Sequence, residues 1–229
     1  MDELGSLPRR IAEVARSLQA ETGSVETMDL AVQLAVETIA GAEDASISLV
    51  HRGRIVETPA MTSDRARDAD QLQYELNEGP LISAIWDEVV VSCPDLAADA
   101  RWGEWGPRAA QQMGIGSVLS FRMFAAKVQL GALSVYSSRP HEFDGADVES
   151  GISFAAHTAI AVTVAQTDEH KDIALDSRSV IGQATGILME RFDLDAVRAF
   201  AALKRISQDR NVKLHELAVE LVRTRRMPS

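Results

Sequence analysis

The sequence predicts an α+β chain in which an antiparallel sheet with flanking helices is followed by a long connecting helix and a C-terminal three-helix bundle. Short alternating apolar segments between turn residues indicate strands in the first part of the chain. Helical periodicity then runs almost without a breaker from Asp144 to Phe192. Two shorter amphipathic helices are expected over residues 196–209 and 214–225.

Charge divides the chain near the same point as these patterns. The 229 residues carry a formal net charge of −11. Residues 1–169 hold 12 Lys and Arg against 26 Asp and Glu, whereas residues 170–229 hold 11 against 8. We expect two domains, 1–165 and 166–229, with different partners, because an acidic body repels nucleic acid and a basic region attracts phosphates. A basic helical face that contacts only solvent explains the charge equally well.

Composition and motifs argue against several classes of protein. One cysteine excludes an internal disulfide, and no segment approaches the roughly 18 uninterrupted apolar residues of a membrane span. Residues 1–10 lack the pattern of a signal peptide, so we expect a cytoplasmic protein. The five histidines show no metal-ligand spacing, and no nucleophile elbow, phosphate-binding glycine loop or paired-carboxylate motif is present. The sequence therefore indicates a protein that is not an enzyme and that has no metal or cofactor.

Strands are expected where apolar residues alternate or run together between turn residues. These segments are residues 46–49, 54–56, 89–91, 117–124 and 130–137. The first two form a hairpin around Arg52–Gly53, and the last two pair through a turn near Lys127. Between the strands, Ser63 is expected to cap a helix that ends near Leu76.

Two helical segments, 4–20 and 146–176, have narrow seams of the kind that pair with another helix. In the first the apolar spacing is close to 3.5 residues, and in the second the seam consists largely of small side chains. Ser24 is a plausible N-cap for the helix between them. We expect both seams to contribute to a homodimer. The expected dimer contacts are Leu7, Ile11, Val14, Ile152, Ala155 and Ala159.

Five segments of the N-terminal part resemble one known sensory family. They are Tyr74–Pro80, Val91–Leu96, Asp99–Trp102, Gly116–Ser120 and Gly131–Tyr136. Together they resemble a GAF domain over about residues 20–165. The resemblance implies a six-stranded antiparallel sheet that separates a helical dimer face from a ligand-binding face. The Asn-Lys-Phe-Asp-Glu signature of cyclic-nucleotide-binding members is absent, which argues against a cyclic nucleotide ligand.

A ligand pocket in this domain would be lined by apolar side chains from loops and short helices. The expected lining is Trp86, Cys93, Trp102, Trp105 and Met113. The same side chains also suit ordinary core packing. Cys93 is either a redox-sensitive thiol or a buried structural residue.

The C-terminal part contains four segments with a recurring spacing. They are Ser177–Arg191, Ala199–Gln208, Asn211–Leu214 and Leu217–Ala218. Together they closely resemble the ANTAR family of transcription antitermination regulators. The resemblance implies a three-helix RNA-binding module that acts as a dimer and captures paired RNA hairpins with short loops. Capture prevents an overlapping terminator from forming.

Polar side chains of this part form a donor-rich set that suits phosphates and unstacked bases. The expected RNA-binding residues are Arg178, Gln183, Lys204, Arg205, Ser207, Gln208, Asn211 and Lys213. Gly182 and Gly186 are costly inside a helix, so either RNA approaches closely there or the helix packs tightly against its neighbours. Phe200 fits the inward face, so aromatic stacking platforms are not expected.

Two other functions remain open from the sequence. The two short C-terminal helices, joined around Arg210–Val212, resemble a DNA-binding helix-turn-helix, although the second helix has few base-reading side chains. Alternatively, the chain is a sensor whose output is a protein contact. Control would come through a small ligand or an upstream regulatory protein, and no membrane contact is expected. The terminal Arg223, Arg225 and Arg226 either add non-specific attraction for RNA or belong to a frayed end.

Overall fold

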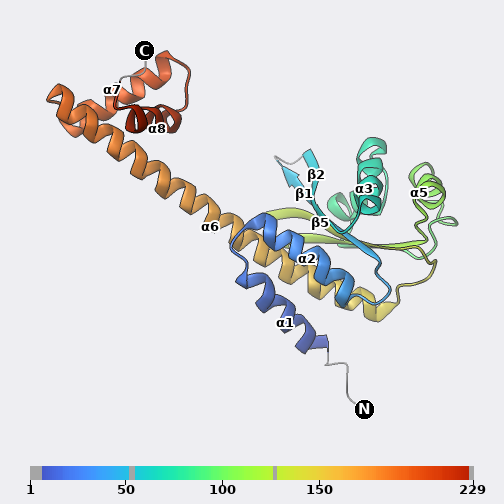
Figure 1. The fold of residues 1–229 in the computed structure, drawn as a ribbon. Coiled ribbons are helices and arrows are strands. Elements are labelled where there is room, and N and C mark those ends of the chain that lie inside the picture. The colour runs from blue at the N-terminus through green and yellow to red at the C-terminus, as the bar shows by residue number, and fades with distance from the viewer. Residues whose placement is uncertain (1–6, 52–54, 126–127, 227–229) are drawn as a thin grey trace. The chain divides into compact units, whose positions relative to one another are not determined.

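The computed structural model describes residues 7–51, 55–125 and 128–226 (Figure 1). The chain forms two compact units, residues 1–166 and 167–229, which we call the sheet unit and the helical unit. The expected turns at Arg52–Gly53 and Lys127 lie outside the described residues.

The sheet unit is built on an antiparallel sheet with the strand order β2-β1-β5-β4-β3. Its strands are β1 (Asp44–His51), β2 (Ile55–Met61), β3 (Val90–Cys93), β4 (Ser117–Ala125) and β5 (Val128–Ser137). Both expected hairpin pairings and the strand near Val90 are confirmed. The described residues form five strands, one fewer than the GAF resemblance implies. Pairing along β3 ends at Cys93, because Pro94 has no N–H to continue it.

The two faces of this sheet differ in chemistry. One face presents Ile47, Leu133 and Val135 to an apolar core. Because side chains alternate along a strand, Ser134 and Tyr136 lie on the opposite face. The helices on this side are α2 (Ser24–Thr38) and the first part of α6 (Gly145–Phe192), and α1 (Leu7–Ala20) packs against α2 in the same core cluster. The other face is covered by α3 (Asp64–Leu76), α4 (Pro80–Trp86) and α5 (Trp105–Met113) (Figure 1).

Helix starts follow the capping chemistry in the sequence. Ser63 caps α3 as expected, since its hydroxyl accepts from the Ala66 N–H at 3.2 Å. The Asp144 carboxylate caps α6 by accepting from the Ala146 N–H at 2.7 Å. The expectation for Ser24 was wrong, because Ser24 is already helical and Gly23 occupies the N-cap position.

The long α6 packs closely on the sheet in its first part. A Cβ added at Gly151 would lie 2.1 Å from the Phe121 ring, so this close approach depends on the glycine. By length and composition α6 is also apolar enough to cross a membrane, because its most apolar 18-residue stretch has a mean hydropathy of 1.3. Of this stretch, 39% is buried in the fold. Core helices of soluble proteins pass the same test.

Most of the expected dimer contacts belong to the protomer's own core. Ile11, Val14, Ala155 and Ala159 are buried among α1, α2, α6 and the sheet, and Leu7 packs against the same cluster. The expected dimer contacts of Ile11, Val14, Ala155 and Ala159 were wrong, because these four side chains are buried within the protomer, whereas the half-buried Leu7 stays a prediction. Of the six, only Ile152 is largely exposed, at 44%.

The helical unit contains the last part of α6 with α7 (Ala196–Asp209) and α8 (Leu214–Thr224). Its core is small and apolar: Ala184, Leu188, Ala199, Leu203, Leu217, Ala218 and Leu221 are its fully buried members. The Asp195 carboxylate caps α7 by accepting from the Arg198 N–H at 2.7 Å.

Candidate nucleic-acid interface

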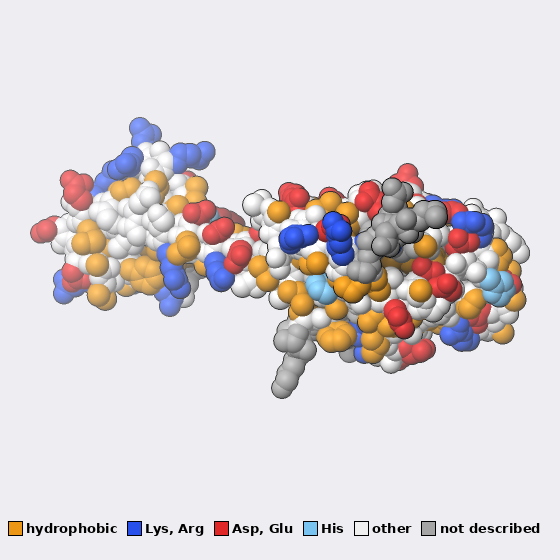
Figure 2. Space-filling view, turned by 90° about the horizontal axis from the view of Figure 1, so that it is seen from below, with side chains coloured by type: hydrophobic (Ala, Val, Ile, Leu, Met, Phe, Trp, Pro, Cys, Tyr) orange, Lys and Arg blue, Asp and Glu red, His pale blue; other side chains and the backbone are white. Residues whose placement is uncertain are grey.

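Most of the expected RNA-binding residues lie on the surface of the helical unit. The exposed ones are Arg178, Gln183, Lys204, Arg205, Gln208, Asn211 and Lys213. Figure 2 shows Lys and Arg side chains at several places around this unit, interspersed with Asp and Glu. Exposure is the property that a phosphate contact needs, because a cation buried in the core would have no access to RNA.

Ser207 is the exception among these residues. Its side chain is buried, and its hydroxyl donates to the Val212 carbonyl at 2.6 Å. That bond closes the turn between α7 and α8, where Asn211 adopts a left-handed conformation with φ of 52°. Ser207 therefore holds the turn in place, and its expected contact with RNA was wrong.

The end of α7 and the following turn gather four exposed polar side chains in a short stretch. Lys204, Arg205 and Gln208 lie within about one helical turn of each other, and Lys213 follows directly after the turn. Arg205 and Lys213 each have a carboxylate partner at 3.8 Å, Asp209 and Glu216 respectively. Exposed pairs at this distance contribute little, so both cations are available for phosphates.

The two expected residues on α6 do not share one face of the helix. Arg178 and Gln183 are five residues apart, which separates them by about 140° around an α-helix. Within the described chain, no hydrogen bond or ion pair joins either of them to the α7 residues. One continuous donor patch that includes both of these residues stays a prediction.

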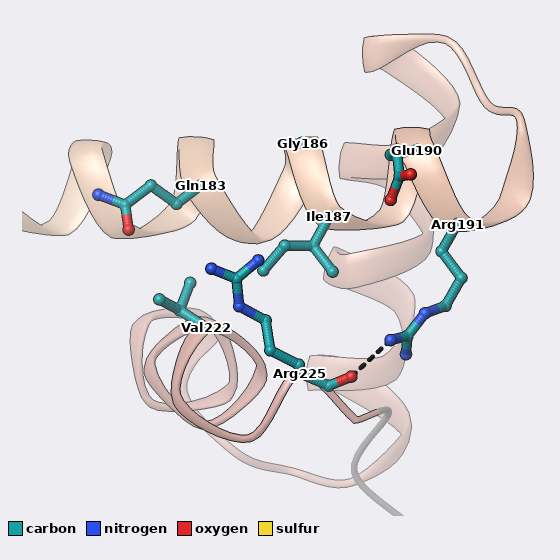
Figure 3. Close-up of a pocket in the computed structure, with 7 residues that line it drawn as sticks. All are labelled: Gln183, Gly186, Ile187, Glu190, Arg191, Val222 and Arg225. Carbon is teal, nitrogen blue, oxygen red and sulfur yellow. Dashed lines mark hydrogen bonds between the residues drawn. The ribbon is translucent and has the colours of Figure 1, made fainter.

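Gln183 instead borders an open hollow of about 530 Å³ between α6 and α8 (Figure 3). The residues that line it are Gln183, Gly186, Ile187, Glu190, Arg191, Val222 and Arg225. The Arg191 guanidinium donates to the Arg225 carbonyl at 2.6 Å and so ties the end of α8 to α6. Sequence reasoning missed this hollow. Gln183, Gly186, Ile187 and Glu190 are spaced as one helix face, which is the signal that could have indicated it.

The structure decides one question about the α6 glycines. A Cβ added at Gly182 or Gly186 would meet no atom within 4 Å. Tight packing against the neighbouring helices is therefore not the reason for either glycine. An exposed glycine in a helix interior costs about 1 kcal/mol relative to alanine. Close approach of RNA stays a prediction for this stretch.

Aromatic side chains are also placed differently from the expectation. Phe200 is 42% exposed, because α7 turns Ala199 and Leu203 toward the core instead. Phe192, at the end of α6, is 50% exposed. The helical unit thus has two accessible rings on which bases can stack.

Four of the five expected ligand-pocket residues belong to the core that α3, α4 and α5 form with the second face of the sheet. Cys93, Trp102 and Trp105 are buried, and Met113 packs against the same cluster. Trp105 donates from its indole nitrogen to the Ala69 carbonyl at 3.1 Å, while Trp86 is exposed. Cys93, Trp102, Trp105 and Met113 thus serve core packing, which is the alternative that the sequence left open, whereas Trp86 does not belong to this core.

Cys93 has the electrostatics of an unreactive thiol. Burial, together with its contact to Asp99, raises the pKa of Cys93 to about 12. The Asp99 carboxylate is held by Arg101, which lowers the pKa of Asp99 to about 2. Since the thiolate is the reactive species, Cys93 is structural in this fold.

A buried polar cluster lies between α3 and the polar face of the sheet. The Asp70 carboxylate accepts hydrogen bonds from Tyr136, from Thr58 at 2.9 Å and from Ser48 at 3.3 Å. The Tyr74 hydroxyl completes the cluster through Ser48 at 2.7 Å. Burial raises the pKa of Asp70 to about 6, and the hydroxyl donors oppose that shift.

Family models match both parts of the chain. The model described as GAF domain matches residues 21–163, and the model described as ANTAR domain matches residues 170–222. No curated protein matches the chain in sequence.

Solved structures that are similar to the chain share the GAF fold. The GAF domain of a phosphoenolpyruvate-protein phosphotransferase from Coxiella burnetii has a TM-score of 0.57 at 14% identity, covering 72% of this chain and 96% of that one. The GAF domain of the Acinetobacter phosphoenolpyruvate-protein phosphotransferase has a TM-score of 0.55 at 13% identity, covering 72% of this chain and 97% of that one. Free methionine-R-sulfoxide reductase from Neisseria meningitidis has a TM-score of 0.57 at 13% identity, covering 73% of this chain and 95% of that one. At these identities the likeness concerns the fold alone.

Both family resemblances expected from the sequence are thus confirmed. GAF and ANTAR domains are regulatory, non-catalytic types, with a sensor role for the first and RNA-binding antitermination for the second. The chain belongs to the GAF family and carries an ANTAR domain after its GAF domain.

Proposed function

We propose that this chain is a signal-responsive regulator whose helical unit binds paired RNA hairpins with short loops and thereby promotes transcription antitermination. The observation that carries the proposal is the ANTAR match over residues 170–222, which coincides with a helical unit whose donors point outward. Capture of the hairpins would keep an overlapping terminator from forming.

Charge supports RNA as the partner of the helical unit. This part of the chain has more Lys and Arg than Asp and Glu, whereas the sheet unit is strongly acidic. Phosphate binding by Lys204, Arg205 and Lys213 would release counterions and give a salt-dependent affinity. Gln208 and Asn211, on the same short stretch, supply hydrogen-bond groups for a loop.

Paired hairpins call for two helical units, and the exposed face of α6 in the sheet unit favours a homodimer. Ile152, Ile160 and Val164 follow one another along this helix and are 44%, 52% and 54% exposed. Residues 150–166 contain no Asp, Glu, Lys or Arg, so two copies can meet there without charge repulsion in spite of the acidic unit around them. Beside this face, Phe124, Ile152 and Ala156 border an apolar hollow of about 80 Å³.

The sheet unit is proposed to receive the signal, by a small ligand or an upstream protein, in the cytoplasm. The inner side of α3 is the most suitable place for a polar ligand, because the Gln73 amide nitrogen, beside the start of α4, is buried without a hydrogen-bond partner among the described residues. A buried polar group of this kind is costly unless something satisfies it.

The test is transcription in vitro from a template whose leader encodes two hairpins that overlap a terminator. We expect the protein to raise read-through on this template and to leave it unchanged when either hairpin loop is replaced. Read-through that does not respond to the protein, with and without the loops, would contradict antitermination.

A DNA-binding regulator is disfavoured by the surface of α8. The helix that would enter the major groove exposes His215, Glu216 and Val219, and acidic side chains repel the DNA backbone.

A further inference from the structure

Four oxygen atoms between α3 and the sheet form a closed ring of hydrogen-bonding contacts. The Asp70 Oδ2 atom lies 2.9 Å from the Thr58 hydroxyl and 3.3 Å from the Ser48 hydroxyl. The Tyr74 hydroxyl closes the ring, at 2.5 Å from Thr58 and 2.7 Å from Ser48. The other carboxyl oxygen of Asp70 accepts from the Tyr136 hydroxyl. The ring thus joins two residues of α3, one helical turn apart, to β1 and β2, and Tyr136 adds β5.

The number of protons in this ring depends on the charge of Asp70. Ser48, Thr58 and Tyr74 bring one hydroxyl proton each, so an ionised Asp70 leaves three protons for four contacts. One pair of oxygen atoms then faces each other with no proton between them. A protonated Asp70 supplies the fourth proton, and each contact around the ring becomes a hydrogen bond. The ring is therefore complete only when Asp70 is neutral.

The groups beside Asp70 favour the neutral form as well. Its side chain is fully buried, and no Lys, Arg or His of the described chain forms a hydrogen bond or ion pair with it. The titratable groups next to it are Tyr74 on α3 and Tyr136 on β5. Burial, together with the nearby Asp70, raises the pKa of both tyrosines well above its ordinary value. Asp70 is thus the group of this cluster whose charge changes near neutral pH.

The charged side chains on the elements around Asp70 are exposed or have partners elsewhere. The helix α4 contains none, and Asp64, Arg67, Asp68 and Glu75 of α3 are exposed. The ion pairs that α3, β1, β2 and α5 contribute are Arg65–Asp44, His51–Glu57 and Arg108–Glu104. A cation that would stabilise ionised Asp70 is therefore not among its described neighbours.

The hold of α3 on the sheet depends strongly on the ring. The buried side chains of α3 are two alanines, Leu72, Asp70 and Gln73, so the helix buries little apolar surface. Gln73 adds little, because its amide nitrogen has no hydrogen-bond partner among the described residues. The hydrogen bonds of the ring are therefore a large part of the contact between α3 and the face of the sheet that it covers (Figure 1). Loss of the Asp70 proton weakens that contact and leaves a buried charge without a cation.

We propose that α3 is a proton-controlled cover on this face of the sheet, which docks when Asp70 binds a proton and loosens when the proton is lost. On opening, the proton passes to solvent and water replaces the hydroxyl groups as donors to the carboxylate. The pH is then a signal that the sheet unit receives without a bound ligand. This inference concerns the sheet unit alone and holds whether or not the helical unit binds RNA.

The test is hydrogen exchange of the full-length protein at pH 5 and pH 7.5, followed by mass spectrometry and corrected for the chemical exchange rate at each pH. The pKa of Asp70 is 3.8 when exposed and about 6 when α3 is docked, so we expect the protection of α3 to fall about tenfold between these pH values. The protection of α2, on the other face of the sheet, and of α8, in the helical unit, should change little.

Two variants test the role of the proton. The amide of Asp70→Asn carries an N–H donor at every pH in place of the acid O–H, so the protection of α3 should be equal at pH 5 and pH 7.5. Asp68→Asn is the control, because it removes a charge from the exposed side of α3 and should keep the tenfold change.

Three results would overturn the proposal or one of its parts. Equal protection of α3 at both pH values in the wild-type protein would overturn the proton-controlled cover, and this comparison needs no variant to fold. An equal loss of protection in α2 would show that the whole sheet unit opens, which would overturn the assignment to α3. A tenfold change that persists in Asp70→Asn would overturn the role of Asp70.

Discussion

The sheet unit and the helical unit handle polar side chains in opposite ways. The sheet unit buries Asp70, Gln73 and a pair of serines, Ser120 and Ser134, whose hydroxyls lie 2.8 Å apart. The helical unit has an apolar core, and Ser207 is its one buried polar side chain among the described residues. Polar groups thus maintain the fold in the first unit and are available to a partner in the second. Substitutions of polar residues should therefore affect stability in one unit and binding in the other.

The largest effect is expected in the sheet-unit core, from Trp105→Ala. Trp105 is fully buried, and removal of such a ring costs about 3–5 kcal/mol of the free energy of unfolding. Urea unfolding followed by tryptophan fluorescence measures this, because Trp86, Trp102 and Trp105 all belong to the sheet unit. The exposed Trp86→Ala is the control and should change stability by less than about 0.5 kcal/mol. Equal losses in both variants would contradict the described burial.

The next effect is a pH dependence that comes from Asp70. Its pKa is raised to about 6 in the folded state from 3.8, so the folded state holds this proton more tightly than the unfolded chain. Protonated Asp70 therefore contributes to the free energy of unfolding. This contribution is fully present below pH 3.8 and is lost as the pH rises through 6, and it amounts to roughly 3 kcal/mol. Asp70→Asn removes this term, so the stability of the variant relative to the wild type should rise between pH 4 and pH 7. A difference that stays constant with pH would show that Asp70 is not the titrating group.

A third prediction separates the two faces of α6 in the sheet unit. Ala159→Leu overfills the core against the sheet and should lower stability by about 1–3 kcal/mol without changing the oligomeric state. Ile160→Glu, on the adjacent exposed face, should leave the fold intact and shift sedimentation equilibrium from dimer toward monomer. If Ala159→Leu dissociated the dimer without lowering the free energy of unfolding, the small-residue seam would be the dimer contact and this prediction would be wrong.

The smallest effects are expected from single cations of the helical unit. Arg205→Ala and Lys213→Ala should each weaken hairpin binding and make its dependence on salt shallower, by about 0.7–0.9 in the log–log slope for each lost phosphate contact. Arg226→Ala should have little effect beyond non-specific attraction. Titrations at several salt concentrations check this, and equal losses from all three variants would indicate only a diffuse basic surface.

The helices and strands were predicted well from the sequence, because strand alternation and helical periodicity depend only on residues that are close together in the chain. The hairpin that contains Ser46 and Ser48 and the long helix that begins after Asp144 were both evident in this way. The surface against which each helix packs was harder to predict from the sequence. A seam such as Ala155 and Ala159 looks the same whether it faces its own sheet or a second protomer, and periodicity alone did not distinguish them.

The candidate interface was predicted in part for a similar reason. Exposed cations such as Arg205 and Lys213 follow from local chemistry and family resemblance. The hollow does not, because Arg225 comes to lie opposite Gly186 only through the packing of α8 on α6. The expectation for Ser207 rested on its hydroxyl as a donor for phosphates or base edges, and the fold uses that hydroxyl for a bond to the Val212 carbonyl instead.

The most direct test of the account is a salt-controlled binding titration of the full-length protein against three nucleic acids: a two-hairpin leader RNA, an unstructured RNA of equal length and a duplex DNA. We expect a preference for the hairpins of at least about tenfold, or roughly 1.4 kcal/mol. Equal affinity for the two RNAs, or a preference for the duplex DNA, would contradict it.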